Sequence, residues 1–167
     1  MPTRLLLSMV LFWSGTAAAT TCAFQDFSRA VRQADAVALV EVKRYLPETV
    51  NGHTFTQDMQ VAVLHTYLGK LAPTIVIRGD NGMAPFPYVT AYPVGTRWVI
   101  PLSHRDWWSQ EPLPRNLYTP VSCSGMGLLV SGPVAYGVLL QQGQTGLAEP
   151  IALNKLPEWV AAYRRKK

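Results

Sequence analysis

Hydrophobic residues change their spacing along the chain, and each spacing predicts a different element. Residues 26–35 carry apolar side chains at positions 27, 30, 31 and 34, which is the spacing of an amphipathic helix, with Asp26 as its N-cap. Residues 36–46 alternate instead, so that Val37 and Val40 fall on opposite faces, as they do in a strand. The chain is therefore predicted to pass from a helix directly into a strand.

Further strands are predicted wherever the alternation returns. The runs 55–69, 74–79 and 96–102 have it, and residues 133–142 and 146–153 form a hairpin pattern. In the first run Met59, Val61, Val63 and His65 share a face, so His65 is expected to be a barrel residue, and an Asn51-Gly52 turn signal precedes that run.

Breaker-rich segments and a terminal helix complete the pattern. Residues 80–95 and 103–116 are predicted loops. The last residues form a helix that Asn154 caps, with Pro157 in the first turn. This order predicts a mainly β protein: an OB-like barrel of five to six strands with an N-terminal and a C-terminal helix.

The start of the chain has the pattern of an export signal. Arg4 precedes the apolar run 5–13, and Ala17-Ala18-Ala19 fits a cleavage site, so residues 1–19 are interpreted as a signal peptide. The apolar run is shorter than the roughly 20 residues that a membrane span needs, although an N-terminal anchor helix is the alternative. We expect a secreted or periplasmic protein whose mature chain begins at Thr20, with Thr21 and Cys22 as the alternative starts.

Export bears directly on the two cysteines. Cys22 could be a lipid attachment point, a nucleophile, a metal ligand or half of a disulfide. The preceding Thr21 disfavours lipidation. If Cys22 were a nucleophile it would need a nearby base, and the sequence indicates none. Because two cysteines in an oxidising compartment most often pair, we expect a Cys22–Cys123 disulfide that clamps the mature N-terminus onto a late strand.

Composition indicates one domain and argues against nucleic acid as a partner. The 167 residues are 49% hydrophobic and carry a net charge of +5. Much of that charge lies in the terminal segment 164–167, so we divide the chain into the signal, one domain over 20–163 and a basic tail. The body is balanced and lacks interleaved basic and aromatic residues. We expect a solvated basic tail, and the alternative is a weak contact of the tail with an anionic membrane surface.

The order of elements resembles the netrin-like (NTR) family, which includes the tissue inhibitors of metalloproteinases, and especially its short secreted bacterial members. The matching pieces span roughly residues 22–126: the post-signal Cys22, "QAD" before "AVALVEV", "VAVLHTYLGK" before "TIVIRGD", "YPVGTRWVIPL" and "SCSG". The resemblance implies an OB-like five-stranded barrel whose first cysteine is tied to a distal one.

The inhibitor mechanism of that family needs a feature that this chain is not expected to have. The eukaryotic inhibitors begin with a C-x-C pair, and the amine of their first cysteine chelates the zinc of a protease. Here Phe24 takes the third position of the pair, and Thr20 and Thr21 precede Cys22. We therefore expect no inhibition by N-terminal chelation.

Motifs of catalysis and metal binding are absent from the sequence. There is no H-E-x-x-H, C-x-x-C or G-x-S-x-G pattern, and His53, His65 and His104 are far apart. A spatial cluster of histidine with Asp80 or Asp106 stays open at this point. We expect no catalytic residues, no metal site and no cofactor, and we interpret the chain as a non-enzyme, with a hydrolase of scattered residues as the alternative.

Aromatic residues in the two loops are the candidate partner-binding residues. Trp107 and Trp108 lie in one loop, and Phe86 and Tyr88 in the other. Tryptophan and tyrosine are frequent in binding hot spots, and OB barrels bind through loops and one face. The resulting hypothesis is an exported binding module that contacts a protein partner through barrel loops. The alternatives are a metalloprotease inhibitor, a structural component of an envelope assembly, or a lid role for the tryptophans.

Overall fold

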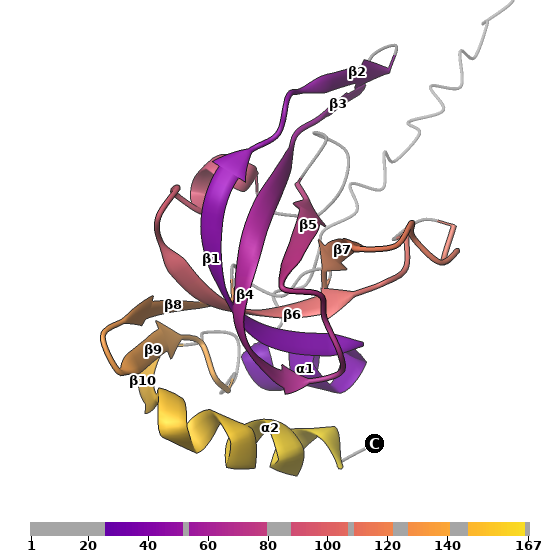
Figure 1. The fold of residues 1–167 in the computed structure, drawn as a ribbon. Helices are drawn as coiled ribbons and strands as arrows, with labels where there is room; N and C mark the ends of the chain where they lie inside the picture. Colours follow the sequence, from indigo (N-terminus) through magenta and orange to yellow (C-terminus); the bar gives the residue numbers. More distant parts are fainter. Residues whose placement is uncertain are drawn as a thin grey trace, which may run out of the picture.

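A closed barrel of five strands dominates the computed structural model of the chain (Figure 1). The structure describes residues 26–51, 54–79, 88–106, 109–121, 127–140 and 147–165. The barrel strands are β1 (Ala36–Tyr45), β4 (Asp58–Leu68), β5 (Thr74–Arg78), β6 (Arg97–Ser103) and β7 (Leu117–Pro120). The predicted mainly β fold, an OB-like barrel with a helix before and after it, is confirmed.

The ring closes through contacts between distant parts of the chain. Its strands follow the order β1-β4-β5-β7-β6, and β6 returns to pair with β1 from Ala36↔Leu102 to Glu41↔Arg97. All neighbours are antiparallel except β5 and β7, which are parallel through Val76↔Leu117 and Ile77↔Tyr118. The parallel pair and the β1–β6 closure together give the OB-like topology.

Three shorter strands extend the sheet beyond the ring. They are β8 (Leu128–Ser131), β9 (Val134–Gly137) and β10 (Glu149–Ala152), and they follow β6 in the order β6-β8-β9-β10. The hairpin predicted from 133–142 and 146–153 corresponds to the paired β9 and β10. β10 ends the sheet, with Pro150 opposite Tyr136 and the N–H of Leu153 donating to the carbonyl of Pro133 at 2.9 Å.

A two-stranded arm projects from the barrel (Figure 1). β2 (Thr49–Asn51) pairs with β3 (Thr54–Thr56) around the predicted Asn51-Gly52 turn, whose second residue lies outside the described residues. The predicted strand 55–69 is therefore divided into β3 and β4, which separate at Gln57. The division lets one part pair in the arm and the other in the barrel.

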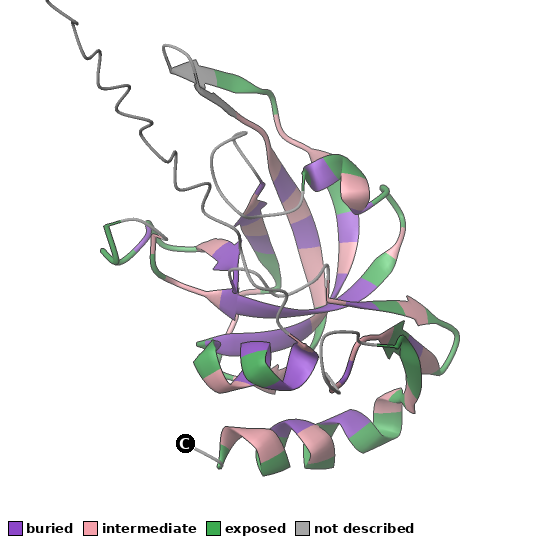
Figure 2. Ribbon diagram, turned by 180° about the vertical axis from the view of Figure 1, so that it is seen from behind, coloured by how far each residue is buried: buried purple, intermediate pink, exposed green. Residues whose placement is uncertain are grey.

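Two helices cover one side of the barrel wall (Figure 2). α1 (Phe27–Gln33) begins as predicted, because the carboxylate of Asp26 accepts a hydrogen bond from the N–H of Arg29 at 2.8 Å. α2 (Leu156–Arg164) starts later than predicted, and Asn154 does not cap it. Asn154 instead lies in a 3₁₀ turn, η2 (Leu153–Lys155), that runs directly into the helix and makes Lys155 its N-cap.

The two ends of α2 bear on two further predictions. Pro157 does lie in the first turn of α2, as expected. Arg164, which the sequence groups with the basic tail, is the last residue of α2, and its Nη1 donates to the carbonyl of Arg32 at 2.6 Å. No helix among the described residues is long and apolar enough to cross a membrane.

Buried side chains form an inner and an outer core. The inner core lies inside the ring and includes Met59, Ile77, Tyr92 and Leu102. The outer core lies between the barrel wall and the two helices. It is built from residues of α1, α2 and the outward faces of the strands, among them Phe27, Val31, Val37, Val99, Leu128, Leu156 and Val160.

His65 lies on the barrel strand β4, as predicted, but its side chain does not share the buried face of Met59 and Val61. The β1–β4 pairing has register irregularities, one of them between Leu39 and Val40. Because such a bulge breaks the strict alternation of faces, the inward pattern of Met59 and Val61 does not continue to position 65. His65 is exposed, and its ring meets that of Tyr67 edge-on at 4.7 Å.

Candidate functional site

The loop of residues 103–116 is a hairpin whose two sides are joined by backbone hydrogen bonds. Beyond β6 and before β7, Arg105 bridges to Pro112, and the N–H of Leu113 donates to the carbonyl of His104 at 3.0 Å. Nearer the tip, the N–H of Asp106 donates to the carbonyl of Glu111 at 2.8 Å. The two strands of the loop are therefore held together up to residues 106 and 111.

The carboxylate of Asp106 braces the tip of this loop. Oδ1 accepts hydrogen bonds from the backbone N–H of Ser109 at 3.1 Å and from the Ser109 hydroxyl at 3.3 Å. Oδ2 accepts a hydrogen bond from Nη1 of Arg78 on β5 at 3.2 Å. One side chain thus closes the segment between 106 and 109 and ties it to the barrel wall.

The base of the loop is fixed to the barrel and to α1. Leu113 is buried, and Oδ2 of Asp35, just after α1, accepts from the N–H of His104 at 2.8 Å and from the Ser103 hydroxyl at 3.3 Å. The buried hydroxyl of Thr119 donates to the carbonyl of Arg105 at 3.1 Å. The loop is therefore connected to α1, β5 and β7.

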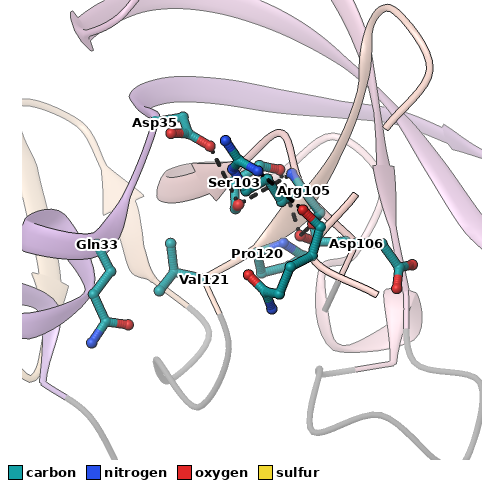
Figure 3. A pocket seen from close by; sticks show the side chains of 9 residues that line it. Gln33, Asp35, Ser103, Arg105, Asp106, Pro120 and Val121 are labelled. Carbon is teal, nitrogen blue, oxygen red and sulfur yellow. Dashed lines mark hydrogen bonds between the residues drawn. The ribbon is translucent and has the colours of Figure 1, made fainter. Parts of the chain in front are cut away.

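A polar cavity of about 220 Å³ lies beneath the loop (Figure 3). Gln33 and Asp35 line one side, and Ser103, Arg105 and Asp106 line another. Arg105 is held in place because its Nη1 donates to the carbonyl of Gln110 at 3.0 Å. The cavity thus presents one arginine between two carboxylates, a mixed polar surface at the foot of the loop.

Arg78 lies between two carboxylates and interacts electrostatically with both. It is the cross-strand partner of Asp58 on β4 and the ion-pair partner of Asp106 in the loop. Burial raises the pKa of Asp58, while the charge of Arg78 and a hydrogen bond from the Gly79 backbone lower it. Oδ1 of Asp58 has no hydrogen-bond partner in the described part of the chain. Arg78 therefore links the loop to the rim of the inner core.

Most of the predicted binding residues fall outside the described residues. Trp107 and Trp108 occupy the two positions between Asp106 and Ser109, and Phe86 precedes the segment that starts at residue 88. Tyr88 is described: it is the N-cap residue of the 3₁₀ helix η1 (Val89–Ala91) and is 60% exposed. Cys22 and Cys123 also lie outside the described residues, so their pairing stays a prediction.

Arg78 and Asp35 are the site residues that sequence reasoning missed. Asp106 followed by Ser109 is a recognisable local signal, because an aspartate often accepts hydrogen bonds from the backbone just after it. Arg78 and Asp35 carry no such signal, because their partners are 28 and 68 or 69 positions away. Only the folded barrel brings them to the loop.

The described residues offer no assembled metal site. No group of three or more histidine, cysteine, aspartate or glutamate residues among them could hold a metal ion. Nε2 of His104 lies 3.2 Å from the Pro114 carbonyl, and its ring packs against Tyr118 at 5.1 Å. Of the histidine and aspartate cluster that the sequence left open, Asp106 forms an ion pair with Arg78, while Asp80 and His53 lie outside the described residues.

Comparison with known proteins adds no relative. No protein-family model matches the chain. None of the curated proteins matches it either.

Proposed function

We propose that this protein is an exported, non-enzymatic binding module that contacts a protein partner through its barrel loops, chiefly the 103–116 loop. Its residence in the periplasm or outside the cell, a Cys22–Cys123 disulfide and membership of the netrin-like family belong to the same proposal. The barrel topology is compatible with that family, although a fold alone does not assign a function.

The observation that carries the proposal is the brace that Asp106 makes across the tip of the loop. Its two oxygens bind Ser109 and Arg78, so the residues on both sides of Trp107-Trp108 are fixed to the barrel. A partner that contacts a loop with fixed ends has less chain to order on binding. Tryptophans presented by such a frame are suited to be binding anchors.

The test is capture of a partner from an envelope extract by the wild-type protein and by Trp107→Ala and Trp108→Ala. We expect each variant to weaken capture by about 2 kcal/mol, or roughly thirtyfold, which is the size of a hot-spot effect. The melting temperature should stay nearly unchanged. Asp106→Ala should weaken capture less, because it frees the tip of the loop but leaves the tryptophans present.

Tyr136→Ala is the matched control, because Tyr136 is 45% exposed on β9, outside the loop. It should capture the partner as well as the wild type does. Unchanged capture by both tryptophan variants would contradict the proposal. Unfolding of both variants would show instead that the tryptophans belong to a lid or core.

A further inference from the structure

The two helices place their C-terminal ends at one corner of the molecule. The rings of Phe27, at the start of α1, and Trp159 of α2 lie 5.5 Å apart, while Arg164 at the end of α2 donates to the carbonyl of Arg32 near the end of α1. The helices therefore run in the same direction, and both views show their ends at the same side (Figures 1 and 2).

Four basic side chains gather at this corner, and we call them the helix-end cluster. Arg32, Arg164 and Arg165 come from the helix ends. Lys70 follows Gly69 in the β4–β5 turn, and this turn touches the end of α1, because a Cβ on Gly69 would lie 2.5 Å from the Asp35 carbonyl oxygen. In the sequence, Lys166 and Lys167 follow directly.

The helix-end cluster forms no ion pair among the described residues, a property that it shares with Arg29, Arg44, Arg105 and Arg115. The ion pairs among the described residues involve Lys43 and Arg97 with Glu41, Arg78 with Asp106, and Lys155 with Glu158. No member of the cluster forms an ion pair with a described carboxylate. Asp35, three residues after Arg32, uses its Oδ2 for Ser103 and His104.

Helix capping explains part of the cluster but not all of it. Arg164 donates to the Arg32 carbonyl, and Nε of Arg165 donates to the Ala161 carbonyl at 3.2 Å. Cations are favourable at these positions because the C-terminal end of a helix is the negative end of its dipole. Lys70 is exposed in a turn and caps neither helix. The positive charge at this corner therefore exceeds what the helix ends require.

We propose that the helix-end cluster rests on the anionic phospholipid headgroups of a membrane surface. The corner is formed by helix ends and a turn, and it carries unpaired cations, which suits a surface of opposite charge. This proposal does not depend on the 103–116 loop.

The test is co-sedimentation of the full chain with phosphatidylcholine vesicles that contain or lack phosphatidylglycerol. We expect binding only to the anionic vesicles, and a decrease of binding as salt is added. Lys70→Gln combined with Arg165→Gln should reduce the apparent affinity by about fivefold for each residue replaced. Both side chains are exposed, so the variant should keep the fold.

Lys43→Gln combined with Arg44→Gln is the control, since it removes the same charge at the opposite end of β1. This variant should bind the anionic vesicles nearly as well as the wild type. Equal losses in the two double variants would overturn the proposal in favour of a net-charge effect. Absence of any preference for phosphatidylglycerol, or unchanged binding by the Lys70 and Arg165 variant, would also overturn it.

Discussion

The inner and outer cores contain similar side chains, but different structures enclose them. A closed ring of five strands surrounds the inner core, and each strand of that ring is paired on both sides. The outer core is covered by α1 and by α2, which is the last element of the chain. The inner core can open only if a sheet pairing breaks, whereas the outer core opens when one helix detaches.

Strand β6 connects the two cores, since it is buried on both faces. Trp98 and Ile100 point into the ring, whereas Val99 between them packs in the outer core. The strand pairs with β1 along one edge and with β7 and β8 along the other. Loss of the ring should therefore destroy the outer core as well, while loss of α2 should leave the ring intact.

The largest expected effect comes from truncating one leucine in each core. Leu102→Ala in the inner core and Leu156→Ala in the outer core both remove a side chain with 0% exposure, so each should cost about 2–5 kcal/mol of unfolding free energy. We expect the Leu102 variant to lose more, because the closed ring cannot collapse around the cavity. Urea denaturation measures both losses.

Hydrogen exchange sharpens this comparison. Leu156→Ala should speed amide exchange in α1 and α2 while the ring strands stay protected, and Leu102→Ala should lower protection throughout. Leu129→Ala is a control, since this leucine is 41% exposed on β8 and its loss should cost far less. Uniform loss of protection in the Leu156 variant would show that the two cores unfold as one.

A smaller effect is expected at Tyr92, whose phenol is buried in the inner core. The side chain is 1% exposed, and its hydroxyl has no hydrogen-bond partner in the described residues. Burial raises the pKa of this hydroxyl, so it stays neutral. Tyr92→Phe should stabilise the protein by about 1 kcal/mol, because it removes an unsatisfied polar group and keeps the ring that packs against Trp98. A loss of stability in urea would contradict this.

The smallest expected effect is a pH dependence at Asp58, on the rim of the inner core. Because burial raises the pKa of this carboxyl above its usual value, the folded state binds its proton more tightly than the unfolded chain does. Protonated Asp58 therefore contributes favourably to the free energy of unfolding. This contribution is complete below the ordinary aspartate pKa and is lost as the pH rises through the raised pKa.

Asp58→Asn removes this titration and keeps an oxygen for the Gly79 N–H. The stability of the variant relative to the wild type should therefore increase as the pH is raised from about 3 to 7, as measured by urea denaturation at several pH values. The reverse trend would show that attraction to Arg78 outweighs burial.

Local patterns predicted the elements of both cores better than they predicted the site. The helix that Asp26 caps and the strand that follows it were readable, because their signals lie within one or two turns of chain. β8 was missed, since four residues between two glycines give too short an alternation to separate from a turn. Asn154 was misjudged because a 3₁₀ turn already precedes the helix.

The braces of the 103–116 loop were beyond sequence reasoning for a different reason. The tryptophan pair and the loop boundaries follow from composition, and Asp106 with Ser109 is a local turn pattern. Arg78 reaches Asp106 only after β5 and β7 pair in parallel, and Asp35 reaches His104 only after β6 closes on β1. Such contacts depend on topology and have no signature near either residue.

Pro150 has a consequence for how this protein behaves in a crowded solution. The bond from Leu153 to Pro133 marks a hydrogen-bonded pair, so alternate residues of β10 bond to β9 and Pro150 directs its backbone outward. A proline nitrogen carries no hydrogen, and a second chain that docked along this edge would lack a donor at its centre. The outer edge of the sheet thus lacks a donor at its centre, which disfavours pairing with the edge strand of a second molecule.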